Sequence, residues 1–300
     1  MRLKPFIEGG LFILLLSSSL AFAKGARIFD KSIDVTKAPP PAGLYTPGVG
    51  QPGALIAFGE NILPKGDSKI GLFSGNYEGI NSHYSNLTSS FLYGLTDTLS
   101  LELIVPFALS FQNNNHHSSG IEDSSAQLEY AVYAKSTLNY QEQATVVMNV
   151  STPTGSTSKE PRTGNGTPTY FLGTTYNRTY ENWFVFASPG LSFMSTQNGT
   201  NYGNKYFYQL GGGLNITEIG THWIFAVVSE LDGLYTEKTK ISGTSSPNTG
   251  GNTIFLTPSL SLTGKRLCLQ VGGGVPIVQN LNGHQNKTNY LLATNISWLL

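Results

Sequence analysis

Apolar and polar residues alternate strictly along residues 99–107 of the sequence, which read "LSLELIVPF". One side of an extended chain would carry Leu99, Leu101, Leu103, Val105 and Phe107. The other side would carry Ser100, Glu102, Ile104 and Pro106. Such alternation predicts a β-strand with two different faces. In a soluble sandwich the apolar face would meet a packed core, whereas in a membrane barrel it would meet lipid and Glu102 would point inward.

Similar alternation recurs along the chain and predicts twelve strands, most of them 11 to 14 residues long. The predicted strands are 52–60, 84–95, 98–110, 125–138, 141–152, 165–178, 182–195, 204–217, 221–234, 251–263, 266–278 and 287–300. These strands are longer than those of most globular proteins. A tilted strand needs roughly 9 to 11 residues to cross the hydrocarbon of a membrane. The lengths therefore favour membrane-spanning strands.

The connections between these segments alternate between short and long. Five are tight turns, near Asp97, Asn139, Glu181, Gly220 and Gly264. The six others are longer and polar, such as the loops that follow Phe111, Thr154 and Lys240. Outer-membrane barrels have an even number of strands, short periplasmic turns and longer external loops. The sequence therefore predicts an all-β fold, a transmembrane antiparallel up-and-down β-barrel of about twelve strands.

The polar faces of these strands carry mostly Ser, Thr, Asn, Gln and Gly, which suits an enclosed, partly wet lumen. The alternation places a few ionisable groups on that face. These candidate lumen residues are Glu102, Glu129, Lys135, Glu230 and Asp232. They would either line a pore and bias it towards cations, or form internal ion pairs in a plugged barrel, with Lys135 neutralising a carboxylate. The sequence leaves both alternatives open.

Aromatic residues gather near the ends of the predicted strands. The candidates for an interfacial girdle are Tyr93, Trp183, Trp223, Tyr290 and Trp298. Trp and Tyr are enriched where a barrel meets the two membrane–water interfaces. The alternative is that each is an ordinary aromatic residue of a β-core. Together with the loop pattern, the girdle is favoured and outer-membrane lipids are the expected partner.

The N-terminal residues predict export. A basic start, the apolar run "LFILLL" and small residues at 21–23 are typical of a signal peptide, here residues 1–23. A membrane-anchoring helix is the alternative. Residues 24–50, with three consecutive prolines, are expected to form a flexible periplasmic segment, and residues 51–300 the barrel. The expected location is the outer membrane of a Gram-negative bacterium.

Composition narrows the range of functions. The formal net charge is zero and only 12% of residues are charged, which argues against a nucleic-acid partner. The single cysteine, Cys268, cannot form an intramolecular disulfide. His116 and His117 lie in a polar loop near Glu122 and Asp123, but a metal site needs at least three ligands that converge. We expect no metal, no cofactor and, since no serine motif marks a nucleophile beside a base, no enzymatic activity.

Several motifs resemble one bacterial family. They are "YGLTDTLSLELIVPF" at 93–107, "VVMNVSTPTG" at 146–155, "TGNG" at 163–166 and the closing stretch 272–297. The sequence resembles the outer-membrane transporter family named for the "MetA-pathway of phenol degradation". The resemblance implies a barrel of about twelve strands that takes up small, often aromatic or apolar compounds. One departure concerns the barrel-assembly machinery, an expected partner that reads a terminal aromatic residue, because this chain ends in Leu300.

The sequence thus predicts a channel or facilitator for passive uptake of small molecules whose identity it does not give. One alternative is a non-transporting surface barrel whose long loops mediate adhesion or host contact. Another is a soluble periplasmic β-protein. Conductance and solute flux distinguish the first two, and fractionation with the outer membrane distinguishes both from the third.

Overall fold

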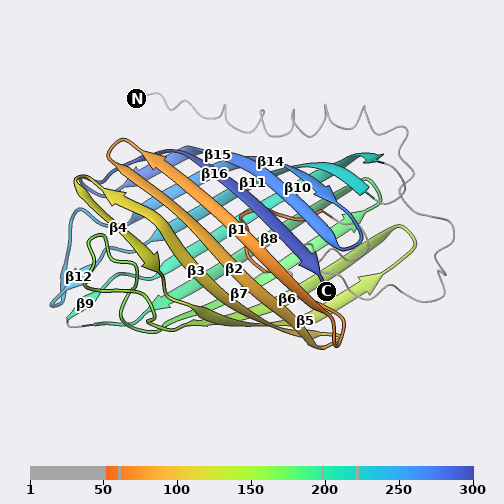
Figure 1. Cartoon of the computed structure of the whole chain (residues 1–300), viewed down its shortest axis with the longest axis horizontal. Coiled ribbons are helices and arrows are strands. Elements are labelled where there is room, and N and C mark those ends of the chain that lie inside the picture. Colours follow the sequence, from red (N-terminus) through yellow and green to blue (C-terminus); the bar gives the residue numbers. More distant parts are fainter. Residues whose placement is uncertain (1–51, 60–61, 198, 220–222) are drawn as a thin grey trace, which may run out of the picture.

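Twelve long antiparallel strands close into a barrel in the computed structural model, which describes residues 52–59, 62–197, 199–219 and 223–300 (Figure 1). They are β1 (Ser68–Gly79), β2 (Ser82–Thr96), β3 (Leu99–Asn113), β5 (Ser125–Ser136), β6 (Tyr140–Ser151), β7 (Thr169–Tyr180), β8 (Trp183–Met194), β10 (Lys205–Ile219), β11 (Trp223–Thr236), β14 (Gly251–Thr263), β15 (Leu267–Leu281) and β16 (Thr288–Leu299). Each pairs with its neighbours in sequence, and β1 pairs with β16. The predicted fold class is confirmed.

The two ends of the barrel differ. Short turns and the C-terminus lie at one end, and the longer connections lie at the other (Figure 1). We call these the short-turn end, which faces the periplasm in outer-membrane barrels, and the long-loop end, which faces outward. The long-loop end carries four short strands: β4 (His116–Ile121), β9 (Thr200–Asn201), β12 (Lys240–Ile241) and β13 (Thr244–Ser245). Strand β4 pairs with the part of β3 nearest the long-loop end, and the other three short strands form a small separate sheet.

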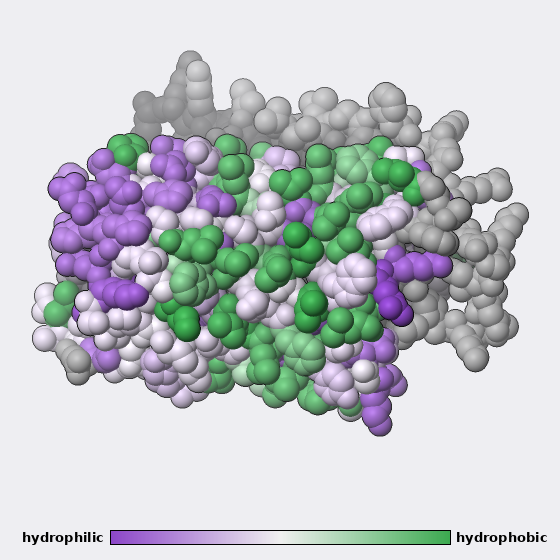
Figure 2. All heavy atoms as spheres, viewed as in Figure 1, coloured by the Kyte–Doolittle hydropathy of each residue, from purple (hydrophilic) through white to green (hydrophobic). Residues whose placement is uncertain are grey.

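Apolar side chains cover the outside of the barrel and polar ones line the inside. Leu103, Val105 and Leu109 of β3 are exposed on the outer face, whereas Ser100 is buried within. Figure 2 shows the apolar residues as a band across the barrel, with the most polar residues gathered at the long-loop end. A Lys or Arg in the middle of such a band costs roughly 2–4 kcal/mol. The chain is therefore an outer-membrane β-barrel, and its apolar face meets lipid.

The first predicted strand is wrong. The described part of residues 52–60 forms no strand and lies inside the barrel, while β1 starts later, at Ser68. The segment 53–58, "GALIAF", is apolar and would pass for a buried strand by composition. In β1, by contrast, Ser74 and Asn76 interrupt the apolar outer face that Ile70 and Leu72 begin. The connection between β1 and β2 at the long-loop end is consequently only residues 80–81.

The predicted signal peptide, 1–23, and the predicted periplasmic segment, 24–50, lie outside the described residues. Both remain predictions. Among the described residues, no helix is long and apolar enough to cross a membrane.

Candidate functional site: a segment seated in the lumen

Residues 52–59 and 62–63, which we call the lumen segment, occupy the inside of the barrel. Ala54, Leu55, Ala57, Ile62 and Leu63 are all buried. Their surroundings are inward-facing side chains of the barrel wall rather than a neighbouring strand. The segment therefore fills space that would otherwise be open to water, and it is not part of the sheet.

The Glu230 carboxylate of β11 binds the lumen segment most directly. Its Oε1 accepts the backbone N–H of Leu55 at 2.5 Å, and its Oε2 accepts those of Ile56 and Ala57, both at 3.1 Å. Only 1% of Glu230 is exposed. Both carboxyl oxygens therefore accept bonds from the segment, and their burial excludes competing water. One side chain of the wall thus holds three consecutive peptide groups.

Asp232 supports the same region through a second side chain. Its Oδ2 accepts the Thr257 hydroxyl at 2.8 Å, and its Oδ1 accepts the Gln209 amide N–H at 3.3 Å. The Gln209 carbonyl oxygen in turn accepts the backbone N–H of Phe58 at 3.2 Å. Because Gln209 is fixed by Asp232, its oxygen is oriented towards the segment.

Further contacts fix the parts of the lumen segment that precede and follow Phe58. Before Phe58, the Gln270 amide donates to the carbonyl of Gly53 at 2.7 Å. After it, the Leu63 N–H donates to the Ser100 hydroxyl at 2.9 Å. Ser100 lies beside the short-turn end, whereas Gln209 lies near the long-loop end of β10. The segment therefore rises into the barrel, reaches its innermost point near Phe58 and returns towards the short-turn end.

Apolar contacts complete the seat of the segment. Ala54 and Ala57 pack in one buried cluster with Phe184, Phe186 and Val228 of the wall. Leu55 packs in a second cluster with residues of β16, Leu291 and Ala293. The wall thus offers both polar and apolar groups that match the sequence "GALIAF".

A cavity of about 240 Å³ lies at the tip of the lumen segment. Phe58 of the segment and Phe171 and Phe207 of the wall form its aromatic side, with ring centroids 4.8 Å apart for Phe58–Phe171, 6.4 Å for Phe58–Phe207 and 5.7 Å for Phe171–Phe207. The remaining lining residues are Ile56 and three amide side chains, Gln127, Asn149 and Gln209. An apolar site with a few fixed polar groups is the usual composition of a small-molecule site.

Four of the five candidate lumen residues point inward. Glu230 and Asp232 hold the lumen segment and Gln209, as described above. Glu129 accepts the Thr145 hydroxyl at 2.7 Å, and Glu102 accepts the Gln127 amide at 3.4 Å. Whether these carboxylates line a conducting path stays a prediction.

The structure places Lys135, the fifth candidate, on the outer face. A β-bulge between Ala131 and Tyr133 adds one residue to β5 and reverses the alternation beyond it. The Lys135 ammonium consequently lies at the exposed rim and donates to the Tyr140 hydroxyl at 3.0 Å. A buried lysine of the lumen that does face these carboxylates is Lys69 of β1, which interacts electrostatically with Glu102 and Glu129.

The candidate girdle residues all face outward. Tyr93, Trp183, Tyr290 and Trp298 are 39–43% exposed, and Trp223 is half-buried. Tyr290 lies near the long-loop end and the other four near the short-turn end. Their role at the membrane interface stays a prediction.

The loop that contains His116 and His117 lies on the polar surface of the long-loop end. His116 lies 3.6 Å from Glu160, and His117 lies 3.3 Å from the Ser110 hydroxyl. Within the described ranges, no three His, Cys, Asp or Glu side chains gather as metal ligands.

Sequence reasoning missed the lumen segment, Lys69 and the supporting groups Gln209, Ser100 and Gln270. Lys69 was not identified as a lumen residue because strand β1 was not predicted. One sequence feature could have identified the lumen segment: its apolar run is bounded by Gly53 and Gly59 and contains no polar residue to alternate with. No sequence feature distinguishes the supporting wall residues, since Ser and Gln line the lumen everywhere.

Comparison with known proteins supports the fold. An outer membrane channel from Pseudomonas putida F1 is similar over 82% of this chain and 100% of its own, with a TM-score of 0.66 and 17% identity. The NanC porin is similar over 77% of this chain and 100% of its own, with a TM-score of 0.48 and 11% identity. The CymD monoaromatic hydrocarbon channel is similar over 89% and 98%, with a TM-score of 0.35 and 10% identity. No protein-family model and no curated protein sequence matches the chain.

Proposed function

We propose that this barrel is a channel for passive uptake of small apolar or aromatic molecules, and that the lumen segment closes its path until it is displaced. The observation that carries the proposal is the seat of the segment: side chains hold it inside a closed wall, and a ring-lined cavity lies at its tip. An engineered apolar cavity of about 150 Å³ binds benzene. The 240 Å³ cavity is thus large enough for a single-ring compound.

The way the segment is held supports a movable closure. The wall is a continuous ladder of twelve strands that closes between β1 and β16. The described backbone N–H groups of residues 55–58 bond to wall side chains instead of joining that ladder. Withdrawal of the segment therefore breaks a few hydrogen bonds and apolar contacts and leaves the barrel intact.

The proposed ligand class follows from the lining of the cavity. Its three phenyl rings provide edges and faces for an aromatic or alkyl group. The amides of Gln127, Asn149 and Gln209 can bond a single hydroxyl or carbonyl on that group. Small neutral compounds of the phenol type combine both features. The similar structure from Pseudomonas putida F1, with a TM-score of 0.66, is an outer membrane channel, which agrees with such a role.

A reversible cross-link tests the proposal. Ala57 of the segment and Val228 of the wall share one contact cluster, and Cys268, the single native cysteine, is buried. We expect a variant with both positions changed to Cys to take up phenol into proteoliposomes when reduced and to stop when oxidised. The single variant Val228→Cys, treated identically, is the control. If neither the reduced variant nor the unmodified protein passes solute, the barrel does not transport, and the adhesion alternative is favoured.

A further inference from the structure

Polar side chains interrupt the apolar outer face of the barrel on three adjacent strands. They are Ser74 and Asn76 of β1, Ser89 of β2 and Thr294 of β16, which we call the polar patch. All four point outward, because side chains alternate along a strand and their neighbours in sequence face the lumen. Strand β1 pairs with β2 on one side and with β16 on the other, so the four residues lie close together. Figure 2 shows pale residues within the apolar band on the side that these strands form.

The polar patch lies at mid-depth in the apolar band. Ser74 and Thr294 pair directly across β1 and β16. Thr294 is four residues from Tyr290, near the long-loop end of β16, and four residues from Trp298, near its short-turn end. Leu72, two residues before Ser74, is exposed on the same outer face. The two hydroxyls are therefore surrounded by groups that meet lipid tails rather than water.

The barrel itself satisfies little of the polar patch. Among the described residues, the Ser74 and Thr294 hydroxyls and the Asn76 amide make no hydrogen bond. The Ser89 hydroxyl donates to the Val105 carbonyl at 3.3 Å. Lipid tails offer neither donors nor acceptors, so an unpaired amide among them is costly. Ser, Thr and Asn side chains in membranes instead bond across contacts between protein surfaces.

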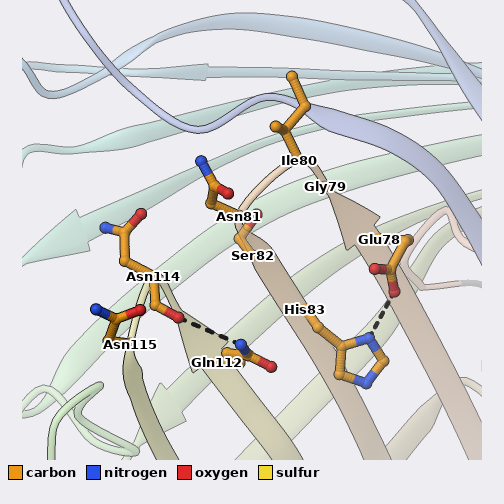
Figure 3. Close-up of a pocket in the computed structure, with 9 residues that line it drawn as sticks. All are labelled: Glu78, Gly79, Ile80, Asn81, Ser82, His83, Gln112, Asn114 and Asn115. Atoms are coloured by element: carbon orange, nitrogen blue, oxygen red, sulfur yellow. Dashed lines mark hydrogen bonds and ion pairs between the residues drawn. The ribbon is translucent and has the colours of Figure 1, made fainter.

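The outer face stays polar from the patch to the long-loop end, but three side chains there are paired. Glu78, His83 and Gln112 line a cavity of about 500 Å³ at the β1–β2 and β3–β4 hairpin tips (Figure 3). Glu78 Oε2 lies 2.7 Å from His83 Nδ1, and the Gln112 amide donates to the Asn114 carbonyl at 3.2 Å. These groups bond within the chain. The polar patch is thus the part of this face that needs a partner from outside.

The grouping of the polar patch sets it apart from the rest of the outer wall. On the described strands away from β16, β1, β2 and β3, mid-strand Ser, Thr and Asn residues that point outward occur singly. They are Thr174 on β7 and Ser229 on β11, two strands that do not adjoin. A two-fold contact uses one surface twice, whereas a closed ring of three or more copies needs two different surfaces. A single patch therefore fits a pair of copies.

We propose that the polar patch is the contact between two copies of this chain in the outer membrane, related by a two-fold axis along the membrane normal. Such an axis keeps every residue at its own depth, so each patch residue meets the same level of the second copy. Ser, Thr and Asn each carry a donor and an acceptor and can therefore bond to their own kind. The contact satisfies the groups that lipid leaves unpaired. It lies on the outside of the wall and does not depend on the proposed transport.

The face around the polar patch is large enough for such a contact. Strands β16, β1, β2 and β3 adjoin in that order. Four strands spaced about 4.8 Å apart and exposed over a band about 25 Å tall present roughly 500 Å² for each copy. Two copies together bury about 1,000 Å², the size from which specific interfaces begin. Leu72, Leu87 and Leu292 are exposed around the patch and supply the apolar part of the contact.

Introduced cysteines test the contact in isolated outer membranes. Cys268 is buried, so a cysteine placed on the outer face is the accessible one. We expect at least one of Ser74→Cys, Asn76→Cys and Thr294→Cys, made one at a time, to give a covalent dimer of twice the chain mass on oxidation with lipid-soluble copper phenanthroline. The matched control is Thr174→Cys, an exposed outward threonine of β7, which we expect to stay monomeric.

Three outcomes of the cross-linking overturn the proposal. A product of another mass shows that a different protein covers the polar patch. The absence of a dimer from all three patch variants shows that the patch meets lipid. Equal dimer from Thr174→Cys shows that the copies collide without a specific contact.

Native mass spectrometry in mild detergent gives an independent measurement. We expect the unmodified protein at twice the mass of the chain, and Asn76→Leu to raise the dissociation constant of the dimer about tenfold, because the amide bonds between copies are lost. Heat-modifiable gel mobility shows that the variant is folded, and Ser74→Ala gives the same direction if it is not. Ser229→Leu, at an outward position of β11, is the control and is expected to dimerise normally. A monomeric unmodified protein, or equal dimerisation of the folded patch variant and the control, overturns the proposal.

Discussion

Replacement of Glu230 by Gln isolates the polar seat of the lumen segment. The carboxylate accepts three backbone N–H groups, one on Oε1 and two on Oε2. Glutamine is nearly the same size but has one acceptor oxygen and a donor NH₂ group. If the amide oxygen takes the place of Oε2, the Leu55 N–H faces a donor and loses its bond.

The magnitude follows from the three bonds. The buried Leu55 N–H, left facing a donor, costs roughly 1–3 kcal/mol. The bonds from Ile56 and Ala57 contribute roughly 0.5–1.5 kcal/mol each and weaken as the amide turns to relieve that contact. We therefore expect Glu230→Gln to weaken the seat of the segment by about 2–4 kcal/mol. That difference raises the ratio of displaced to seated segment by roughly 30- to 1,000-fold.

Single-channel recording in planar bilayers measures that ratio as the fraction of time spent at high conductance. We expect Glu230→Gln to spend far more time at high conductance than the unmodified protein, with unchanged heat-modifiable mobility because the wall is intact. The matched control is Thr263→Val, a buried lumen hydroxyl that bonds Ser261 and contacts Cys268 but not the segment. If Glu230→Gln and Thr263→Val both record like the unmodified protein, Glu230 does not hold a closure and the reasoning is refuted.

Three further predictions concern the cavity, the buried cation and the lipid face. Phe171→Ala removes one ring of the cavity, and we expect the phenol concentration for half-maximal flux to rise about tenfold while the flux of a small ion stays unchanged. Lys69→Met leaves Glu102 without its buried cation, so we expect urea unfolding in detergent to show a loss of about 3–5 kcal/mol; equal stability would show that the charges are not coupled. Leu103→Lys places a charge on the lipid face and is expected to cost about 2–4 kcal/mol by the same assay, whereas Leu138→Lys at an exposed turn costs little.

The barrel wall was predictable because the membrane enforces it. A residue such as Leu103 must meet lipid, and its neighbour Glu102 cannot, so the alternation reads directly as outside and inside. Turn spacing then gives the strand order, since consecutive antiparallel strands with tight connections pair with each other. These constraints act locally along the chain and leave a mark in the sequence.

Features that depend on contacts across the barrel could not be predicted from local sequence patterns. The bulge in β5 that turns Lys135 outward arises from how β5 meets β6, and no residue type announces it. The segment "GALIAF" has the composition of a buried strand, but its backbone bonds to the side chains of Glu230, Gln209 and Gln270, which lie far along the chain. The seat of the segment is thus set by partners roughly half the chain away, which periodicity cannot reveal.

Deletion of residues 52–63 tests the central claim most directly, because the claim is that these residues block an otherwise open path through the lumen of the barrel. The measurement is single-channel conductance of the deleted and unmodified proteins, each refolded and shown to be heat-modifiable. We predict that the deletion gives a large, continuously open conductance and that the unmodified protein is mostly closed. Equal conductance of the two proteins, or none from the deleted barrel, would contradict the account.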